Sequence, residues 1–392
     1  MKTLFILGLL LSTSLSAISL GEVIQKSLAT APSLESINAR IKANRYATEV
    51  ANQFSNPELS LTKNSLSSSE KMSQTVLSIK QTIPYYGKRD SRQKITLAEH
   101  EILQEKLNNA KVALVAKIKI EAYTVWELKE LYKVIEDYVT LTKQNIELYE
   151  SYTSIRDNQH IGIMKAELSL ADLKIQQSLL KSKIASAYAK LSYLAAFEIT
   201  DLEIVLNIGK KPHLNTLKGE LTKNPALLVK EKELKKKRAK IKLAMLNHYP
   251  DLNLLTGYAH RENFDNYFNI GFSLSLPIYG TEDSQEEEVR AEALVVKNQT
   301  EDTKIVIFEE LKVYYAQMLS SYQIYHIIED DALPQIAHMF ELSSSSISTG
   351  GDLFKYIDVL FDKLSLEQKR INAVSNYNKA NAEIAKLSGE IQ

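Results

Sequence analysis

Two stretches of the chain alternate between apolar and polar residues, which predicts β-strands. In YFNIGFSLSLP one face is wholly apolar, and it consists of Phe268, Ile270, Phe272, Leu274 and Leu276. Each of these two stretches, one in each half of the chain, contains two alternating segments. They predict strand hairpins at about residues 57–83 and 250–277. Strands of this length, about 9–11 residues, can cross a bilayer when tilted. The alternation alone is equally consistent with half-buried hairpins of a soluble sandwich.

The remainder of the chain has a helical period. Apolar or small residues recur every three or four positions from residue 103 to residue 149, and no Pro or Gly occurs between Lys88 and Ile155. At 1.5 Å per residue this predicts a helix of about 100 Å. Residues 282–347 repeat the pattern, with Pro334 predicting a kink. Each long helix is expected to be followed by a turn and a returning helix, which gives helical hairpins at about 88–200 and 282–392. Helices of this length are not found in a compact globular core.

A shorter helical stretch is predicted before each hairpin, at residues 20–54 and at about 215–248. The second of these contains the basic run KEKELKKKRAKIK, residues 230–242. We interpret this run as a solvated helix face rather than a specific anion site.

The two halves share one register of Pro and Gly residues. Four pairs are each 193 residues apart: Pro32 and Pro225, Pro57 and Pro250, Pro84 and Pro277, and Gly87 and Gly280. Because the chain has only 8 Pro and 12 Gly in 392 residues, such coincidence by chance is very improbable. The sequence therefore predicts two tandem copies, residues 18–206 and 215–392, joined by a linker at 207–214.

Pro84, Gly87, Pro277 and Gly280 lie where the predicted strands give way to the long helices. A proline can end a strand because it donates no ladder hydrogen bond, and a glycine permits the bend into the helix. The Lys88–Arg89 pair follows Gly87 in the first copy only, so we interpret it as having no chemistry of its own.

The first 17 residues have the layout of a secretory signal peptide: a Lys, an apolar run and small residues before Ala17. The apolar run is too short for a membrane anchor. The chain has no Cys, which excludes disulfides, thiolate metal sites and a lipid-accepting Cys at the cleavage site. Its net charge of zero gives no support for nucleic-acid binding.

No catalytic or metal-binding pattern is present in the sequence. The 7 His residues lack the spacing of a metal site, and the chain has no nucleophile elbow, phosphate-binding loop or HExxH motif. We therefore expect neither an enzyme nor a cofactor, and transport energy would have to come from a partner.

Four strands in one chain cannot close a barrel. An open hairpin in lipid would leave backbone N–H and C=O groups unpaired, at several kcal/mol each. A barrel shared by identical chains avoids this cost, and three chains supply twelve strands, enough for a hollow lumen. The long helices of three chains would then bundle into a helical tube.

The order of helix, strand hairpin and long helical hairpin, given twice, resembles the outer-membrane efflux (TolC-like) proteins over the whole mature chain. NPELSL, QTIPYYGKR, PDLNLLTGY and FSLSLPIYG are similar to segments flanking the two hairpins in the cobalt–zinc–cadmium (CzcC-like) branch, and GGDLFKYIDVL is like its second helical tip. The resemblance implies a homotrimer with a 12-stranded β-barrel in the outer membrane of a Gram-negative bacterium and an α-helical coiled-coil tunnel in the periplasm.

The resemblance also implies a function and partners. Such a trimer is the exit duct of a tripartite efflux system, expected to be of the RND type, for metal cations or drugs. It works with a periplasmic adaptor protein and an inner-membrane pump, and its barrel contacts outer-membrane lipid. An exit duct for type I protein secretion remains open, as does a periplasmic coiled-coil scaffold without a channel. The uncovered apolar face of the second hairpin favours the channel over the scaffold.

The resemblance places a gate at the helical tips. Asp358 matches the first acidic gate position, but the usual second Asp is Phe361 here, with Asp362 one residue beyond. Three further polar residues at the tips are gate candidates: Asp352, Asp157 and Asn158. Helix capping is the simpler interpretation of Asp352 and Asp157.

Overall fold

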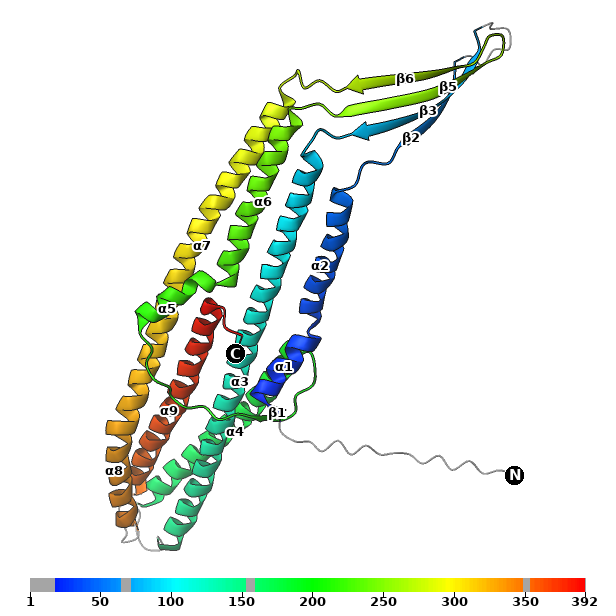
Figure 1. Ribbon diagram of the computed structural model, residues 1–392. Coiled ribbons are helices and arrows are strands. Elements are labelled where there is room, and N and C mark those ends of the chain that lie inside the picture. The colour runs from blue at the N-terminus through cyan, green and yellow to red at the C-terminus, as the bar shows by residue number, and fades with distance from the viewer. Residues whose placement is uncertain (1–17, 65–71, 153–158, 348–352, 392) are drawn as a thin grey trace, which may run out of the picture. The chain divides into compact units, whose positions relative to one another are not determined.

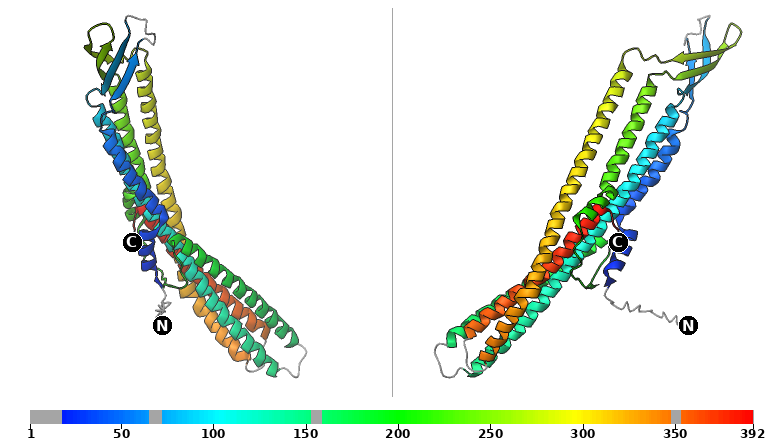
Figure 2. Two further views of the ribbon diagram at one scale, coloured as in Figure 1. Left: turned by 90° about the vertical axis from the view of Figure 1, so that its right-hand side faces the viewer. Right: turned by 60° about the vertical axis from the view of Figure 1, so that its left-hand side comes forward.

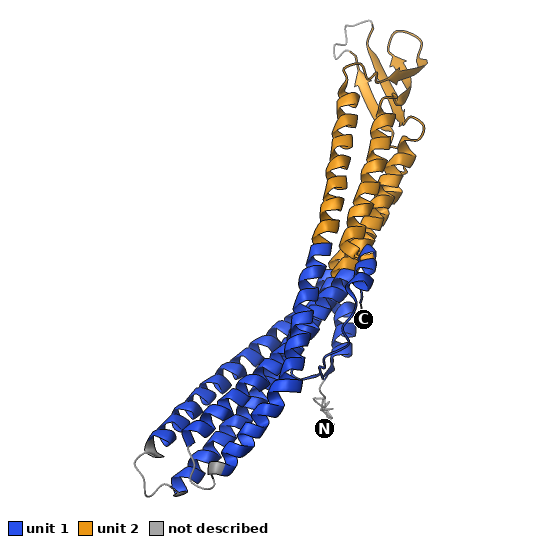
Figure 3. Ribbon diagram, turned by 90° about the vertical axis from the view of Figure 1, so that its left-hand side faces the viewer, with its two compact units in different colours: residues 1–34, 111–222, 308–392 blue, residues 35–110, 223–307 orange. Residues whose placement is uncertain are grey.

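The computed structural model describes residues 18–64, 72–152, 159–347 and 353–391. The chain divides into two compact units, shown in Figure 3. Unit 1 contains residues 1–34, 111–222 and 308–392, and unit 2 contains residues 35–110 and 223–307. These units are not the two sequence copies, because each unit takes residues from both halves of the chain.

Unit 2 contains a four-stranded antiparallel sheet (Figure 1). Its strands are β2 (Glu58–Lys63), β3 (Gln74–Ile83), β5 (Leu252–Arg261) and β6 (Tyr267–Leu274). Their order is β2-β3-β5-β6, so the two predicted hairpins join through β3 and β5, with Ile83 opposite Leu252. Strands β2 and β6 form the two edges.

The register sorts the side chains by polarity. Residues paired across the four strands share a face, as in the row Leu61, Leu77, Tyr258 and Phe268. The apolar face contains Leu59, Leu61, Leu77, Ile79, Ile83, Leu252, Leu254, Tyr258, Phe268, Ile270, Phe272 and Leu274. Leu276, expected within the last strand, lies beyond it because β6 ends at Leu274.

Four helices adjoin the strands of unit 2: α2 (Pro32–Ala51), α3 (Lys88–Tyr152), α6 (Pro225–Asn247) and α7 (Thr281–His326). Helices α2 and α6 precede β2 and β5, whereas α3 and α7 follow β3 and β6. Within unit 2 the helices run side by side in the order of their strands (Figure 2). The 65 residues of α3 match the predicted rod closely.

Proline divides both of the helical stretches that the sequence predicts as continuous. The first becomes α1 (Leu20–Thr30) and α2, which starts at Pro32, and the second becomes α5 (Leu214–Glu220), a 3₁₀ turn (Leu221–Lys223) and α6, which starts at Pro225. Proline is favoured in the first helical turn because its missing N–H has no helical partner there.

Unit 1 is built from the remaining parts of α3 and α7 together with α4 (Gln159–Ala195), α8 (Leu333–Ile347) and α9 (Leu353–Ser388). One core cluster joins Ile135 of α3, Leu173 of α4 and Leu360 of α9, all fully buried or nearly so. A second cluster surrounds Val23 of α1 and Leu202, which lies in a short parallel pair of β1 (Ile18–Ser19) and β4 (Leu202–Glu203).

The interruption expected at Pro334 takes the form of a π-helical segment, Ile327–Ala332, between α7 and α8. The Leu333 N–H donates to the Ile328 carbonyl, five residues back. Because Pro334 has no N–H, the ladder cannot continue unchanged through this point, and the wider turn absorbs the irregularity.

Candidate functional site

The apolar face of the sheet is open to the surroundings. Phe268, Ile270 and Phe272 are 80%, 81% and 78% exposed, and the large apolar side chains of the other three strands are exposed as well. A contiguous apolar surface of this kind marks a site of protein or membrane interaction.

The opposite face of the sheet carries hydroxyl and amide groups that bond across the strands. The Ser60 and Ser78 hydroxyls lie 2.8 Å apart, and the Thr82 hydroxyl donates to Asn253 Oδ1 at 2.7 Å. On β5, Gly257 leaves no room for a side chain, because an added Cβ would lie 2.5 Å from Asn269 Oδ1. This face therefore carries polar groups that bond across the strands, and at Gly257 the Asn269 side chain lies close to the backbone.

The first strand-to-helix junction lies between β3 and α3. Gly87 has φ of +85°, in the left-handed region that favours glycine, and α3 begins at the next residue. The Lys88 side chain is only 6% exposed, and its Nζ lies 2.7 Å from Asp251 Oδ1 and 2.7 Å from the Tyr249 carbonyl oxygen. The Tyr85 and Tyr249 rings stack with centroids 4.5 Å apart. These contacts clamp the start of α3 to the segment between α6 and β5.

Asp251 is the acidic partner in this clamp. Burial alone would raise the pKa of Asp251, but hydrogen bonds from the Lys88 ammonium and the Tyr85 N–H outweigh burial and hold the pKa below its ordinary value. The carboxylate is therefore charged at neutral pH and fixed in place.

Arg89 forms a second tie at the same junction. Its guanidinium donates to the Asn52 carbonyl at 3.0 and 2.6 Å and lies 4.0 Å from the centroid of the Phe54 ring. The sequence interpretation of Lys88–Arg89 as a pair without chemistry of its own did not foresee this structural role, in which both residues link elements that are distant in the sequence. No local pattern marks Asp251 or Asn52 as their partners.

The second junction, between β6 and α7, has the same backbone conformation at its glycine. Gly280 has φ of +75° and precedes α7, as Gly87 precedes α3. Its cross-link differs: His248 Nε2 lies 3.1 Å from Glu286 Oε2, and His248 Nδ1 lies 3.8 Å from Asp283 Oδ1. The tyrosines preceding the two glycines, Tyr86 and Tyr279, are 91% and 90% exposed.

Two of the gate candidates, Asp358 and Asp362, lie in α9 near its first residue, Leu353. Asp358 forms an ion pair with Lys165 of α4, whose ammonium also lies 3.4 Å from the centroid of the Phe354 ring. Phe361 packs against the core cluster, and Asp362 is exposed. The candidates Asp157, Asn158 and Asp352 lie outside the described residues.

The basic run in α6 is not merely a solvated face. Lys232 and Lys235 contact Glu101 of α3, Lys236 contacts Glu99, and Lys237 contacts Glu292 of α7. The run thus forms ion pairs with both neighbouring helices, and its net charge is partly compensated within unit 2.

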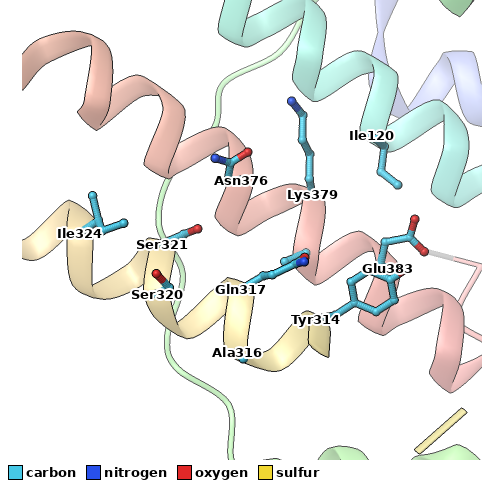
Figure 4. Close-up of a pocket in the computed structure, with 11 residues that line it drawn as sticks. Ile120, Tyr314, Ala316, Gln317, Ser320, Ser321, Ile324, Asn376, Lys379 and Glu383 are labelled. Carbon is cyan, nitrogen blue, oxygen red and sulfur yellow. The ribbon is translucent and has the colours of Figure 1, made fainter. Parts of the chain in front are cut away.

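A cavity of about 710 Å³ opens between α7 and α9 in unit 1 (Figure 4). Its lining includes Tyr314, Gln317 and Asn376, together with Lys379 and Glu383. The Lys379 ammonium is 2.6 Å from Glu127 Oε2, and Glu383 Oε2 is 2.8 Å from the Lys386 ammonium, so the charged groups of the cavity are already paired. The lining does not form a nucleophile–base arrangement.

Within the described ranges, no group of three or more His, Asp or Glu side chains is placed to hold a metal ion. Among the same residues, no helix combines the length and the apolar character required to cross a membrane.

Solved structures show what this chain is similar to. It matches the outer membrane protein VceC from the bacterial pathogen Vibrio cholerae with a TM-score of 0.80 and 14% identity, over 95% of this chain and 96% of that one. It matches the open state of the MtrE outer membrane channel from Neisseria gonorrhoeae with a TM-score of 0.81 and 16% identity, over 95% and 89%. The CmeC outer membrane channel from Campylobacter jejuni gives 0.78 and 12%, over 94% and 85%.

No protein-family model matches the sequence, and a search of curated proteins finds no match. The similarity to the solved structures extends over nearly the whole chain and establishes the fold, which is the one that outer-membrane channel proteins adopt. These structures are channels rather than enzymes, in agreement with the prediction from the sequence.

Proposed function

We propose that three copies of this chain form an outer-membrane channel-tunnel that serves as the exit duct of a tripartite efflux system. A 12-stranded barrel would cross the outer membrane, and the long helices would form a tunnel in the periplasm. A periplasmic adaptor and an inner-membrane pump would complete the system, as the family resemblance implies. The observation that carries the proposal is the four-stranded sheet, which has one apolar face and two open edges.

The strand directions favour closure into a ring. The three pairings in the sheet are all antiparallel, so β2 and β6 run in opposite directions. The β6 edge of one copy can therefore pair with the β2 edge of the next copy and continue the antiparallel order. Such head-to-tail contacts close into a ring and satisfy the edge N–H and C=O groups, which lipid cannot do.

The helices beside the two edges support the same arrangement. Helix α2 adjoins β2, and α7 adjoins β6, so pairing of the edges would bring α7 of one copy next to α2 of another. Both helices carry exposed apolar side chains in unit 2, among them Tyr46 and Val50 on α2 and Leu294 and Ile305 on α7. Contact between these side chains would remove them from water.

We place the gate of the tunnel at the ends of α4 and α9. The ion pair between Lys165 and Asp358 compensates the carboxylate that the resemblance assigns to an acidic ring. Asp362, exposed one turn later, is the remaining acidic candidate among the described residues of this end. A single acidic ring at Asp362 is therefore our proposal for the constriction.

We further propose that the chain is exported with its first 17 residues as a cleaved signal peptide and that the barrel anchors it without a lipid. The tandem repeat of residues 18–206 and 215–392 would have arisen by duplication, which the recurrence of Pro-x-Tyr-Gly before both long helices supports.

Membrane fractionation and channel recording test the function. Outer-membrane location, trimers that resist SDS until heated, and conductance in planar bilayers are the expected results. The variant Phe272→Asp places a charge on the lipid-facing side and should reduce barrel insertion, by less than the about 2–4 kcal/mol that Arg or Lys costs near the bilayer midplane. The matched variant Ser273→Asp, on the polar face, should insert normally. A periplasmic monomer that tolerates Phe272→Asp would instead identify a scaffold.

The pump determines which substrate is transported. The resemblance to the cobalt–zinc–cadmium branch therefore supports a proposal for the substrate class but identifies no substrate-binding site in this chain. Deletion of the gene should sensitise cells to metal cations or to drugs. Loss of a secreted protein without either sensitivity would instead identify a type I secretion duct.

A further inference from the structure

We infer that the barrel does not select solutes by charge, and that Lys80 maintains this property by compensating Glu58. The inference rests on the proposed channel, in which the polar face of the sheet lines the lumen. It concerns the class of solute that can pass: hydrated cations, anions and neutral molecules alike.

The charge of the sheet balances within each copy. The described residues of the four strands and of the turn between β5 and β6 include three acidic and three basic side chains: Glu58, Glu262 and Asp265, and Lys63, Lys80 and Arg261. Four of these belong to the end of the sheet near that turn, where Lys63 lies 3.6 Å from Glu262 and the Arg261 side chain donates to the Asp265 carbonyl.

The two remaining charges face the lumen at the other end of the sheet, whereas Arg261, which the register also places on the polar face, lies at the end near the turn. Glu58 and Lys80 are opposite each other in the β2–β3 register, and Lys80 Nζ lies 3.3 Å from Glu58 Oε2. Both side chains are substantially exposed, so the pair contributes little to stability. Its effect is on the electric field, because a ring of uncompensated carboxylates in a low-dielectric wall would concentrate cations.

The rest of the polar face includes the apolar side chains of Val76, Leu255 and Ala259 together with groups that can solvate either sign of charge. Hydroxyl and amide side chains both donate and accept hydrogen bonds, and on this face they include Ser60, Ser78, Thr82, Asn253, Asn269 and Ser273. Small side chains such as these leave the lumen wide. A cation therefore gains no electrostatic attraction inside the barrel, and discrimination between solutes must occur in the helical tunnel or in the partners.

Ion selectivity of the purified trimer tests the inference. The reversal potential is measured in planar bilayers across a KCl gradient, at about 0.01–0.1 M, where the Debye length of ~30–10 Å preserves the field of a fixed charge. Lys80→Gln should increase the ratio of K⁺ to Cl⁻ permeability several-fold, and Glu58→Gln should decrease it. The double variant should return the ratio to that of the unmodified channel.

Lys63→Gln is the matched control, because it removes the same charge from the opposite face of the sheet and should leave the ratio unchanged. Unchanged ratios in Lys80→Gln and Glu58→Gln, in channels that conduct, would overturn the inference while leaving the channel intact. Absence of conductance in the unmodified protein would overturn the channel itself.

Discussion

The two strand-to-helix junctions have the same backbone but are held in different ways. Both read Pro-x-Tyr-Gly, and both place the glycine in the left-handed region directly before a long helix. At the first junction a buried lysine, an arginine and a pair of stacked tyrosines fix the helix to its neighbours. At the second junction, His248 contacts carboxylates of α7, and Leu276 and Ile278 are 64% and 70% exposed, against 37% and 39% for Ile83 and Tyr85 at the first junction.

The position of each junction in the sheet explains this difference. Strand β3 is central and pairs with β5, so residues that follow β3 can reach residues that precede β5, as Lys88 reaches Asp251. Strand β6 is an edge, and its junction has a neighbour from the same chain on one side only. The two junctions thus share the turn, whereas the neighbouring elements determine the cross-links. The junction with fewer cross-links lies where our proposal places another copy.

Among substitutions at the two junctions, replacement of Lys88 should have the largest effect on the free energy of unfolding. Lys88→Ala removes the ammonium from the Tyr249 carbonyl and from Asp251, which keeps only the Tyr85 N–H. The loss should cost about 3 kcal/mol in the free energy of unfolding, at the lower end for a broken buried pair because Asp251 is 28% exposed. Thermal unfolding of the detergent-solubilised protein measures the loss. Lys94→Ala, an exposed lysine of the same helix, is the control and should change stability by less than about 0.5 kcal/mol. Equal effects of the two variants would show that the clamp contributes nothing.

Substitution of Gly87 and substitution of Gly280 should destabilise the protein to a similar extent. Gly87→Ala and Gly280→Ala each force a side chain into left-handed backbone, at about 1–2 kcal/mol. The added Cβ at Gly87 would meet Leu246 at 3.5 Å, an ordinary contact, so crowding adds little. Comparison of the unfolding midpoints of the two variants tests whether both junctions depend on a glycine in the left-handed region to the same degree. A large effect at one position alone would separate the junctions.

Acid should weaken the first junction through Asp251. Because the folded-state pKa of Asp251 is lowered, its stabilising contribution is present above the unfolded pKa of about 3.9 and is lost as pH falls through the folded value. The stability difference between the unmodified protein and Asp251→Asn, about 1 kcal/mol, should be constant above about pH 5 and shrink below about pH 4. A difference that is independent of pH down to about pH 2 would exclude this contribution.

The exposed tyrosines should have the smallest energetic effect. Tyr86→Ala and Tyr279→Ala remove side chains that are about nine-tenths exposed, so each should alter stability by less than about 0.5 kcal/mol. Their proposed location is the membrane boundary, where aromatic rings are enriched. Tyr86→Trp and Tyr279→Trp, in a Trp126→Phe background, should be quenched equally by lipids labelled near the headgroup. Quenching of neither would remove both junctions from the boundary.

The sequence was sufficient to predict what depends on local periodicity. The alternation in β6 and the apolar period of α3 each follow from neighbouring residues, and the 193-residue spacing of Gly87 and Gly280 predicted both bends. Contacts between distant residues were not predictable in this way. Asp251 is 163 residues from Lys88, and Lys165 is 193 residues from Asp358, so neither partner leaves a local signal.

The boundary between the two units was also beyond the sequence. The long helices α3 and α7 each pass through both units without a Pro or Gly near residue 110 or 307 to mark the change. The π-helical segment before Pro334 shows the same limit: the proline indicated an interruption, but its form depends on how the ladder relaxes.

The most direct test of the account is a cross-link between the two edges of the sheet. The chain has no Cys, so paired substitutions introduce the only thiols. Ser60→Cys on β2 is combined in turn with Asn269→Cys, Gly271→Cys and Ser273→Cys on β6, and with Ile270→Cys on the opposite face as the control. Oxidation of one of the first three pairs should yield covalent dimers and trimers and no larger species. Monomers throughout, or an open series beyond the trimer, would contradict a barrel closed by three copies.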